Sequence, residues 1–280
     1  MATQSGEPGR KHWNSIAQCW HLYSSPLRPG VEDIETFLRV IRRHVPEPVD
    51  APRQALVLGV TPEIVTMPWP GPTMVTGADR SQEMIEHVWP GDRPGLRQAL
   101  CVDWFNLPEP ARAYEVVMAD GSFNTLGYPA ELRGLLAMLA GLTAQRALLI
   151  TRTFTRPNER ESLASLEEAA RAGEAGGFHA FKFRLAMALQ PAPEAGVSLD
   201  EIWRLWHRFD CEIENLSERN GWHPDVVGTI AHFRGKPVRL SFPTRDELLA
   251  TLGAAGLSLL DSHTPTYEMG ERCPILSWRF

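Results

Sequence analysis

The feature that most constrains this chain is an alternation of short apolar runs with segments that can form helices. The runs cover residues 55–59, 73–78, 99–102, 115–119 and 146–151. Such runs suit strands that are buried on both faces of a sheet. The segments between them that can form helices are residues 62–65, 81–88 and 129–141. This order predicts an α/β fold with a mostly parallel sheet and helices on both faces.

Composition narrows the classes of function. The chain has 280 residues, of which 34 are acidic and 28 basic, so its net charge is −6. An acidic chain matches a phosphate backbone poorly, and we expect no nucleic-acid partner. The most apolar stretch, residues 134–142, has about half of the roughly 20 residues that span a bilayer. With a polar N-terminus as well, we expect a cytoplasmic protein without a membrane segment.

The four cysteines, Cys19, Cys101, Cys211 and Cys273, are far apart in the sequence. None belongs to a Cys-x-x-Cys pair, and none has a histidine nearby at zinc spacing. We therefore expect reduced thiols and no metal site.

The sequence divides into three parts. Residues 1–50 are expected to form an N-terminal helical lid, with a disordered tail over 1–12 and helices over 13–22 and around 34–41. Residues 51–152 and 240–280 form the predicted sheet core. Residues 153–239 interrupt the core after the fifth strand as an inserted helical lobe, beginning with a charged helix over 157–175. Capping boxes at Ser198–Glu201 and Thr244–Glu247 each predict the start of a helix.

Acidic side chains follow three of the predicted strands, at the point where each strand ends. Asp79 lies 79 − 59 = 20 residues after Gly59, the glycine that ends the first run. In nucleotide-binding sheets, an acid at about this distance accepts hydrogen bonds from ribose hydroxyls. Asp103 with its neighbour Trp104 can bind the amino edge and the face of adenine. Asp120 follows the fourth run, beside the point where such a sheet reverses its winding and ligands bind.

These strand-end residues resemble those of the class I S-adenosylmethionine-dependent methyltransferases. The resemblance covers residues 54–151 and resumes from 242 to the end of the chain. It implies a Rossmann-like, seven-stranded sheet and S-adenosyl-L-methionine as cofactor. It also implies that Asp79 holds the ribose, that Asp103 approaches the adenine amine, and that the loop Asp120–Ser122 lies near the methionine part.

The first strand's loop departs from the family's acid-x-Gly-x-Gly-x-Gly pattern. Val57 replaces the acid, Thr61 the second glycine and Glu63 the third, so only Gly59 is kept. Another group must then hold the cofactor's amino-acid end, and Tyr23 and Arg28 are candidates, because a guanidinium matches a carboxylate. The full set expected to bind the cofactor is Tyr23, Arg28, Gly59, Thr61, Pro62, Asp79, Arg80, Asp103, Trp104, Asp120, Gly121 and Ser122.

The predicted function is in-line methyl transfer from S-adenosylmethionine to a small, partly hydrophobic molecule. The sequence does not single out a base. Tyr128, near the fourth strand's loop, and His179, in the lobe, are weak candidates that packing roles explain as well. Two alternatives stay open: a non-catalytic cofactor-binding or regulatory protein of the same fold, and an NAD(P)-dependent oxidoreductase, which the missing Gly-x-Gly-x-x-Gly motif disfavours. The oligomeric state is not predicted.

Overall fold

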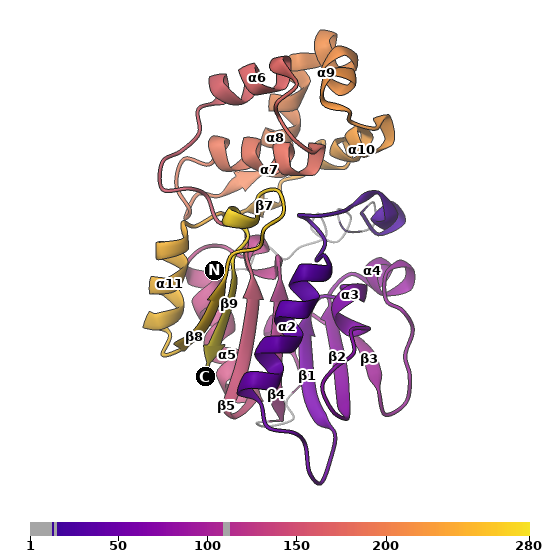
Figure 1. Cartoon of the computed structure of the whole chain (residues 1–280), viewed down its shortest axis with the longest axis vertical. Helices are drawn as coiled ribbons and strands as arrows, with labels where there is room; N and C mark the ends of the chain where they lie inside the picture. The colour runs from indigo at the N-terminus through magenta and orange to yellow at the C-terminus, as the bar shows by residue number, and fades with distance from the viewer. Residues whose placement is uncertain (1–12, 14–15, 109–112) are drawn as a thin grey trace.

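A computed structural model describes residue 13 and residues 16–108 and 113–280. Its centre is a seven-stranded sheet with the strand order β3-β2-β1-β4-β5-β9-β8 (Figure 1). The strands are β1 Arg53–Leu58, β2 Thr73–Asp79, β3 Arg97–Cys101, β4 Tyr114–Asp120, β5 Thr143–Arg152, β8 Ser258–His263 and β9 Ile275–Arg279. Strands β1 to β5 are parallel, and β9 runs antiparallel between β5 and β8. The predicted Rossmann-like α/β fold is confirmed.

The central strands bury both of their faces, as the unbroken apolar runs predict. In β1, Ala55 and Val57 point into one core, whereas Leu56 and Leu58 point into the other. This alternation follows from the two-residue period of a strand.

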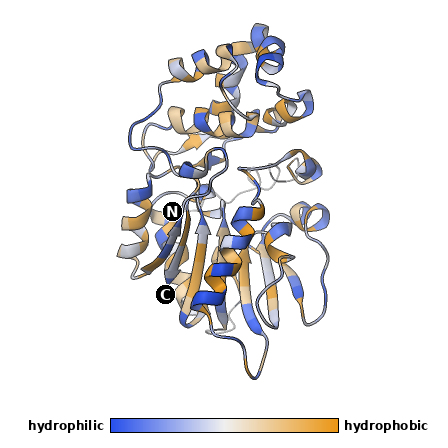
Figure 2. Cartoon of the chain, in the orientation of Figure 1, coloured by the Kyte–Doolittle hydropathy of each residue, from blue (hydrophilic) through white to orange (hydrophobic). Residues whose placement is uncertain are grey.

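Helices cover each face of the sheet. On the first face lie α2 (Val31–His44), α3 (Pro62–Val65) and α4 (Gln82–His87), which pack through residues such as Phe37, Ile64 and Met84. On the second face lie α5 (Ala130–Leu142) and α11 (Arg245–Ala254). Figure 2 shows α2 with a hydrophobic and a hydrophilic side, the pattern of a helix with one buried face.

The inserted lobe lies beyond the carboxyl ends of the parallel strands (Figure 1). Its helices are α6 Leu163–Ala172, α7 Phe178–Leu189, α8 Leu199–Trp206, α9 Ile213–Asn220 and α10 Pro224–Gly228. They surround a core of their own, in which the Trp206 ring packs against Phe178 and Phe181. The lobe also contains a two-stranded antiparallel pair, β6 Val197–Ser198 with β7 Arg239–Leu240, which the sequence did not predict. Among the described residues, no helix has the length and apolar character to cross a bilayer.

The N-terminal lid differs from the prediction of a helix over residues 13–22. The chain leaves the helical conformation after residue 18 and forms a 3₁₀ turn, η1, at Trp20–Leu22. The carbonyls of Trp20 and Tyr23 accept hydrogen bonds from Arg28, and the Leu22 carbonyl bonds His179. These carbonyls are therefore bound by side chains from other parts of the chain and not only by the backbone of a helix. The tail predicted over residues 1–12 lies outside the described residues.

The charged helix predicted over residues 157–175 is wrong at its start. Helix α6 begins only at Leu163, because the Ser162 hydroxyl caps it by accepting from the amide of Ser165. The carboxylate of Glu161, just before this cap, instead pairs with Arg184 and Arg272. Both capping boxes, at Ser198–Glu201 and Thr244–Glu247, are present as predicted.

Asn124 holds together the two segments that enter and leave the lobe. It lies in η3 (Ser122–Thr125), after β4, and only 3% of it is exposed. Its side-chain amide donates to the carbonyls of Phe154 and Ser241, both at 2.8 Å, and its side-chain oxygen accepts from the Phe154 amide at 2.9 Å. One side chain thus satisfies three buried backbone groups on both segments.

We expect Asn124→Ala to lower the free energy of unfolding by roughly 3 kcal/mol, because it leaves these backbone groups buried without partners. Asn124→Asp should also destabilise, since an oxygen would then face two carbonyls. Urea unfolding measures the change, with the exposed Asn106→Ala as control. Equal midpoints for Asn124→Ala and Asn106→Ala would contradict this role.

Candidate functional site

The carboxyl ends of β1, β2 and β4 lie in one row. Leu58 pairs with Ala78 on one side and with Ala119 on the other, so the next residues, Asp79 and Asp120, flank Gly59. Neighbouring strands are about 4.8 Å apart, so the two aspartate backbones lie about 10 Å apart. Cys101 pairs with Asp79, and Asp103 follows two residues later. The three predicted acids therefore meet at one edge of the sheet.

Gly59 gives this edge an open centre. Its φ is +117°, a conformation that residues with a side chain rarely adopt, and its amide donates to the Ala78 carbonyl at 2.8 Å. A Cβ built at this position would meet no atom within 4 Å. The turn therefore needs glycine for its conformation, and the backbone beside it is accessible to a ligand.

Asp79 combines one backbone partner with an unfavourable environment for its charge. Its Oδ1 accepts from the amide of Ser81 at 2.8 Å. Burial raises the pKa of Asp79 from 3.8 to about 6, although this hydrogen bond and the charge of Arg80 both favour the ionised form. Carboxylates perturbed in this way concentrate at binding and catalytic sites.

Asp103 and Trp104 form the wall of the edge beside β3. Asp103 caps η2 (Trp104–Asn106), because its Oδ1 accepts from the Phe105 amide at 3.0 Å. Its Oδ2 lies 3.8 Å from a guanidinium nitrogen of Arg80. The Trp104 indole donates to the Ala78 carbonyl at 2.7 Å, so this ring crosses from β3 to the end of β2.

Arg28 and Glu63 form an ion pair at the altered glycine loop. The Arg28 Nε donates to Glu63 Oε1 at 2.8 Å, and a second guanidinium nitrogen contacts the same oxygen. The other oxygen, Oε2, is buried and has no hydrogen-bond partner within the described part of the chain. Where the family's loop has its third glycine, this chain has Glu63. One oxygen of its carboxylate accepts no hydrogen bond from the described residues.

Helix α3 is a single turn that begins after Thr61, a type of residue that often caps a helix with its hydroxyl. Thr61 occupies the cap position, and its backbone carbonyl accepts from the amides of Ile64 and Val65, but its side chain makes no capping bond. Pro62 takes the first helical position, as expected. What this turn presents beside the strand end is the side chain of Glu63.

Asp120 is engaged within the protein. Its carboxylate accepts from the Nε of Arg152, the last residue of β5, at 2.5 Å, and both side chains are almost completely buried. A guanidinium nitrogen of Arg152 also donates to the Pro26 carbonyl at 2.8 Å and lies 3.7 Å from Asp33 of α2. Arg152 therefore pairs with one carboxylate of the sheet and one of the lid.

The two residues after Asp120 are also engaged. Gly121 adopts a φ of +65°, and its amide donates to the Arg152 carbonyl at 2.8 Å. The Ser122 hydroxyl donates to the Leu58 carbonyl at 2.6 Å, which joins the β4 loop to the end of β1. Both residues thus fix the shape of the edge.

The two weak catalytic candidates lie in different places. The Tyr128 hydroxyl donates to the Glu247 carbonyl at 2.8 Å and lies 2.6 Å from the Thr251 hydroxyl, so it joins the loop before α5 to α11. This is the packing role. His179 lies in α7 and stacks on the ring of Tyr23, with centroids 5.2 Å apart and planes inclined by 10°. Tyr23 therefore packs against the lobe, while Arg28 reaches the sheet edge.

Sequence reasoning missed three residues that the structure makes prominent: Glu63, Asp33 and Lys182. Glu63 had been noted only as a lost glycine. Asp33 reaches Arg152 across more than a hundred residues of sequence, and no local pattern could have indicated that. The rarity of lysine could have drawn attention to Lys182, because only three of the 28 basic residues are lysines.

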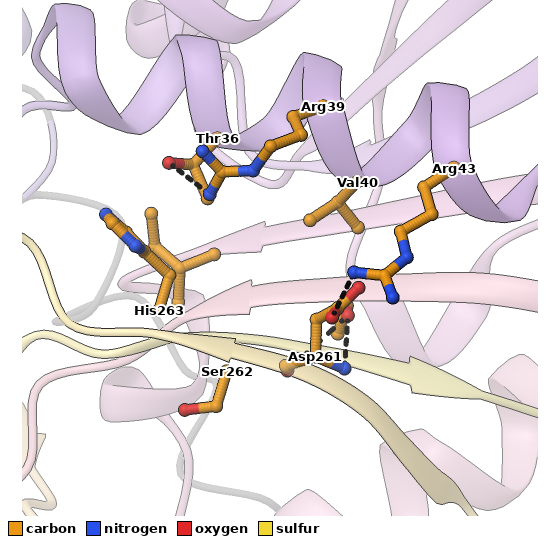
Figure 3. A pocket seen from close by; sticks show the side chains of 9 residues that line it. Thr36, Arg39, Val40, Arg43, Asp261, Ser262 and His263 are labelled. Carbon is orange, nitrogen blue, oxygen red and sulfur yellow. Dashed lines mark hydrogen bonds and ion pairs between the residues drawn. The ribbon is translucent and has the colours of Figure 1, made fainter.

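A cavity of about 200 Å³ lies away from this edge (Figure 3). It lies between α2 and strands β8 and β9, beside Thr36, Arg39, Arg43, Asp261 and His263. Arg43 reaches across to Asp261, with 3.1 Å between their nearest charged atoms. The cavity borders the antiparallel side of the sheet and includes none of the predicted site residues.

Comparison of the sequence with protein-family models and with curated proteins finds no match. Among solved structures, a protein from Rhodobacter sphaeroides described as a Zn-dependent alcohol dehydrogenase has a TM-score of 0.60 at 14% identity, over 97% of this chain and 98% of that one. The CcbJ methyltransferase from Streptomyces caelestis has a TM-score of 0.54 at 15% identity, over 96% and 97%. A 1,6-didemethyltoxoflavin-N1-methyltransferase from Burkholderia thailandensis has 0.52 at 12% identity, over 100% and 92%. The chain has the fold of class I S-adenosylmethionine-dependent methyltransferases.

The raised pKa of Asp79 predicts a pH-dependent effect of removing its charge. A carboxyl whose folded pKa exceeds its ordinary value contributes stability below pH 3.8, and this contribution is lost as the pH rises through about 6. Asp79→Asn should therefore raise the free energy of unfolding by about 1–3 kcal/mol at pH 8 and have little effect at pH 3.5. Urea unfolding at both pH values tests this, with the exposed Asp246→Asn as control. An equal effect of Asp79→Asn at both pH values would contradict it.

Proposed function

We propose that this protein transfers a methyl group from S-adenosylmethionine to a small molecule. One observation carries the proposal: two acids and an aromatic ring meet the Arg28–Glu63 pair at the carboxyl edge, around the open turn at Gly59. Ligands of open α/β sheets bind at this edge. Asp79 suits the ribose hydroxyls, and Asp103 with Trp104 suits the adenine.

The Arg28–Glu63 pair supports binding of the cofactor's amino-acid end. An α-amino acid carries one carboxylate and one ammonium, and the pair offers one guanidinium and one carboxylate. The buried Glu63 Oε2, which has no partner in the described residues, fits an ammonium donor. Glu63 would thus supply the negative charge that the family's loop acid provides and that Val57 lacks, while Arg28 would take the ligand carboxylate.

The bound cofactor supplies the activated methyl group, and the chain's own residues provide binding, orientation and exclusion of water. The lid covers the sheet edge through Arg28, and Pro26 joins it to Arg152. The lobe lies above both (Figure 1). We infer that these two parts enclose the acceptor, and that their aromatic side chains favour a partly hydrophobic small molecule over a nucleic acid.

Two ligands separate the roles of these residues. S-adenosylhomocysteine has the amino-acid part, whereas 5′-methylthioadenosine lacks it. Asp79→Ala should weaken both at least tenfold, because hydrogen bonds to charged groups contribute about 1.5–3 kcal/mol. Glu63→Gln and Arg28→Ala should weaken S-adenosylhomocysteine by a similar factor and leave 5′-methylthioadenosine unchanged. Calorimetric titration measures each affinity.

Absence of S-adenosylhomocysteine binding at millimolar concentration would reject the proposal. A thermal shift with NADH but not with S-adenosylmethionine would favour the oxidoreductase alternative. Cofactor binding without turnover on any acceptor would favour a non-catalytic binding protein.

A further inference from the structure

Lys182 of α7 is a buried amine with no anionic partner among the described residues. Its exposed fraction is 0%, and no carboxylate of the described residues lies within ion-pair distance of it. Its Nζ contacts the Thr229 hydroxyl at 3.5 Å. An unpaired ammonium in such a place is costly, and burial lowers the pKa of Lys182 to about 7.

Aromatic rings enclose the Lys182 amine. Its Nζ lies 4.9 Å from the ring centroid of Phe233, 5.3 Å from that of Tyr23 and 5.8 Å from that of Phe178. We call Phe178, His179, Lys182, Thr229, His232 and Phe233 the lobe cage. Tyr23 enters this cage from the lid.

The surroundings of the two histidines of the cage favour their neutral forms. The Nε2 of His179 contacts the Leu22 carbonyl at 2.9 Å, and because a carbonyl only accepts, Nε2 carries the proton. The buried Nδ1 then keeps a lone pair that no described residue contacts. Burial, reinforced by the charge of Lys182, lowers the pKa of His179 to about 4, and the same two causes lower that of His232. The cage therefore offers an amine and imidazole nitrogens but no carboxylate.

The ring that occupies the cage is a phenol. Tyr23 stacks on His179, and its hydroxyl lies 3.5 Å from the Nδ1 of His232. Burial, with a contribution from nearby Cys19, raises the pKa of the Tyr23 hydroxyl, so it stays protonated. The structure thus holds a hydroxyaryl group whose ring stacks on His179, with the Lys182 amine 5.3 Å from the ring centroid and with His232 beside the hydroxyl.

The cage is connected to the sheet edge by direct contacts. The Tyr23 carbonyl accepts from a guanidinium nitrogen of Arg28 at 3.3 Å, and that guanidinium pairs with Glu63. A ligand that took the place of the Tyr23 ring would therefore lie one lid segment away from the proposed cofactor site.

We propose that the lobe cage binds the hydroxyaryl end of the acceptor, which replaces the Tyr23 ring, and that the Lys182 amine takes the proton of its hydroxyl. The O–H bond breaks, its proton forms a fourth bond to Nζ, and the electron pair stays on the oxygen. The resulting ammonium then faces the aryl oxide, so the buried cation has its missing anion. This inference rests on the proposed function for the methyl group that the oxygen receives.

The test uses the full chain without cofactor and 4-nitrophenol as the probe, because only its ionised form absorbs strongly in the visible. At pH 6, adding the wild-type protein should increase the nitrophenolate absorbance. Lys182→Met, similar in size but uncharged, should abolish this increase and weaken binding at least tenfold. Lys236→Met, which changes the lobe's other lysine, should leave both unchanged. Tyr23→Ala should strengthen binding about tenfold, because it empties the cage.

A second measurement titrates the wild-type protein, so its result does not depend on whether a cage variant folds. With lysines ¹³C-labelled at the ε carbon, the chain gives three lysine signals, and the variants serve only to assign them. In the free protein the Lys182 signal should titrate near pH 7, and at pH 8, where the amine is mostly unprotonated, the signal should shift to its ammonium position when 4-nitrophenol binds. No binding by the wild type, equal absorbance with wild type and Lys182→Met, or an unmoved Lys182 signal on binding would each overturn the inference.

The outcomes also separate the two proposals. Nitrophenolate binding that depends on Lys182, with no binding of S-adenosylhomocysteine, would reject methyl transfer and keep the hydroxyaryl site. Binding of S-adenosylhomocysteine without Lys182-dependent nitrophenolate binding would reject the site and keep the proposed function.

Discussion

The buried guanidinium of Arg152 is the interaction on which the arrangement of the parts depends. It contacts Asp120 at the end of β4, Asp33 of α2, the Pro26 carbonyl of the lid and the Tyr267 hydroxyl of the loop before β9. Removing a guanidinium from water is costly unless carboxylates and carbonyls replace the solvent. These partners come from four segments, so the end of β4, α2, the lid loop at Pro26 and the loop before β9 must dock together around one charge.

The parallel core could be predicted because its information is local. Each central strand is an apolar run, and each is followed by a residue that only a strand end explains, such as Gly59 or Asp79. The resemblance to the methyltransferases added the expectation of seven strands. Capping boxes identified helix starts for the same reason, since a side chain and an amide three residues away are enough to define them.

Contacts between distant segments could not be predicted from the sequence. The Arg28–Glu63 pair joins residues 35 positions apart, and only the fold brings them together. Residues 13–22 of the lid have apolar side chains at helical spacing. A longer helix would have used the carbonyls of Trp20 and Leu22, but Arg28 and His179 bind them.

Asn124 has a consequence for how such a protein can diversify. The two segments that lead into and out of the lobe hydrogen-bond to the same side-chain amide, so they leave the sheet within a few ångströms of each other. An insertion whose ends nearly touch can be exchanged for another of different length, because the sheet beneath it needs no adjustment. The fold thus separates an edge suited to one constant ligand from a module in which selectivity for its reaction partner can evolve.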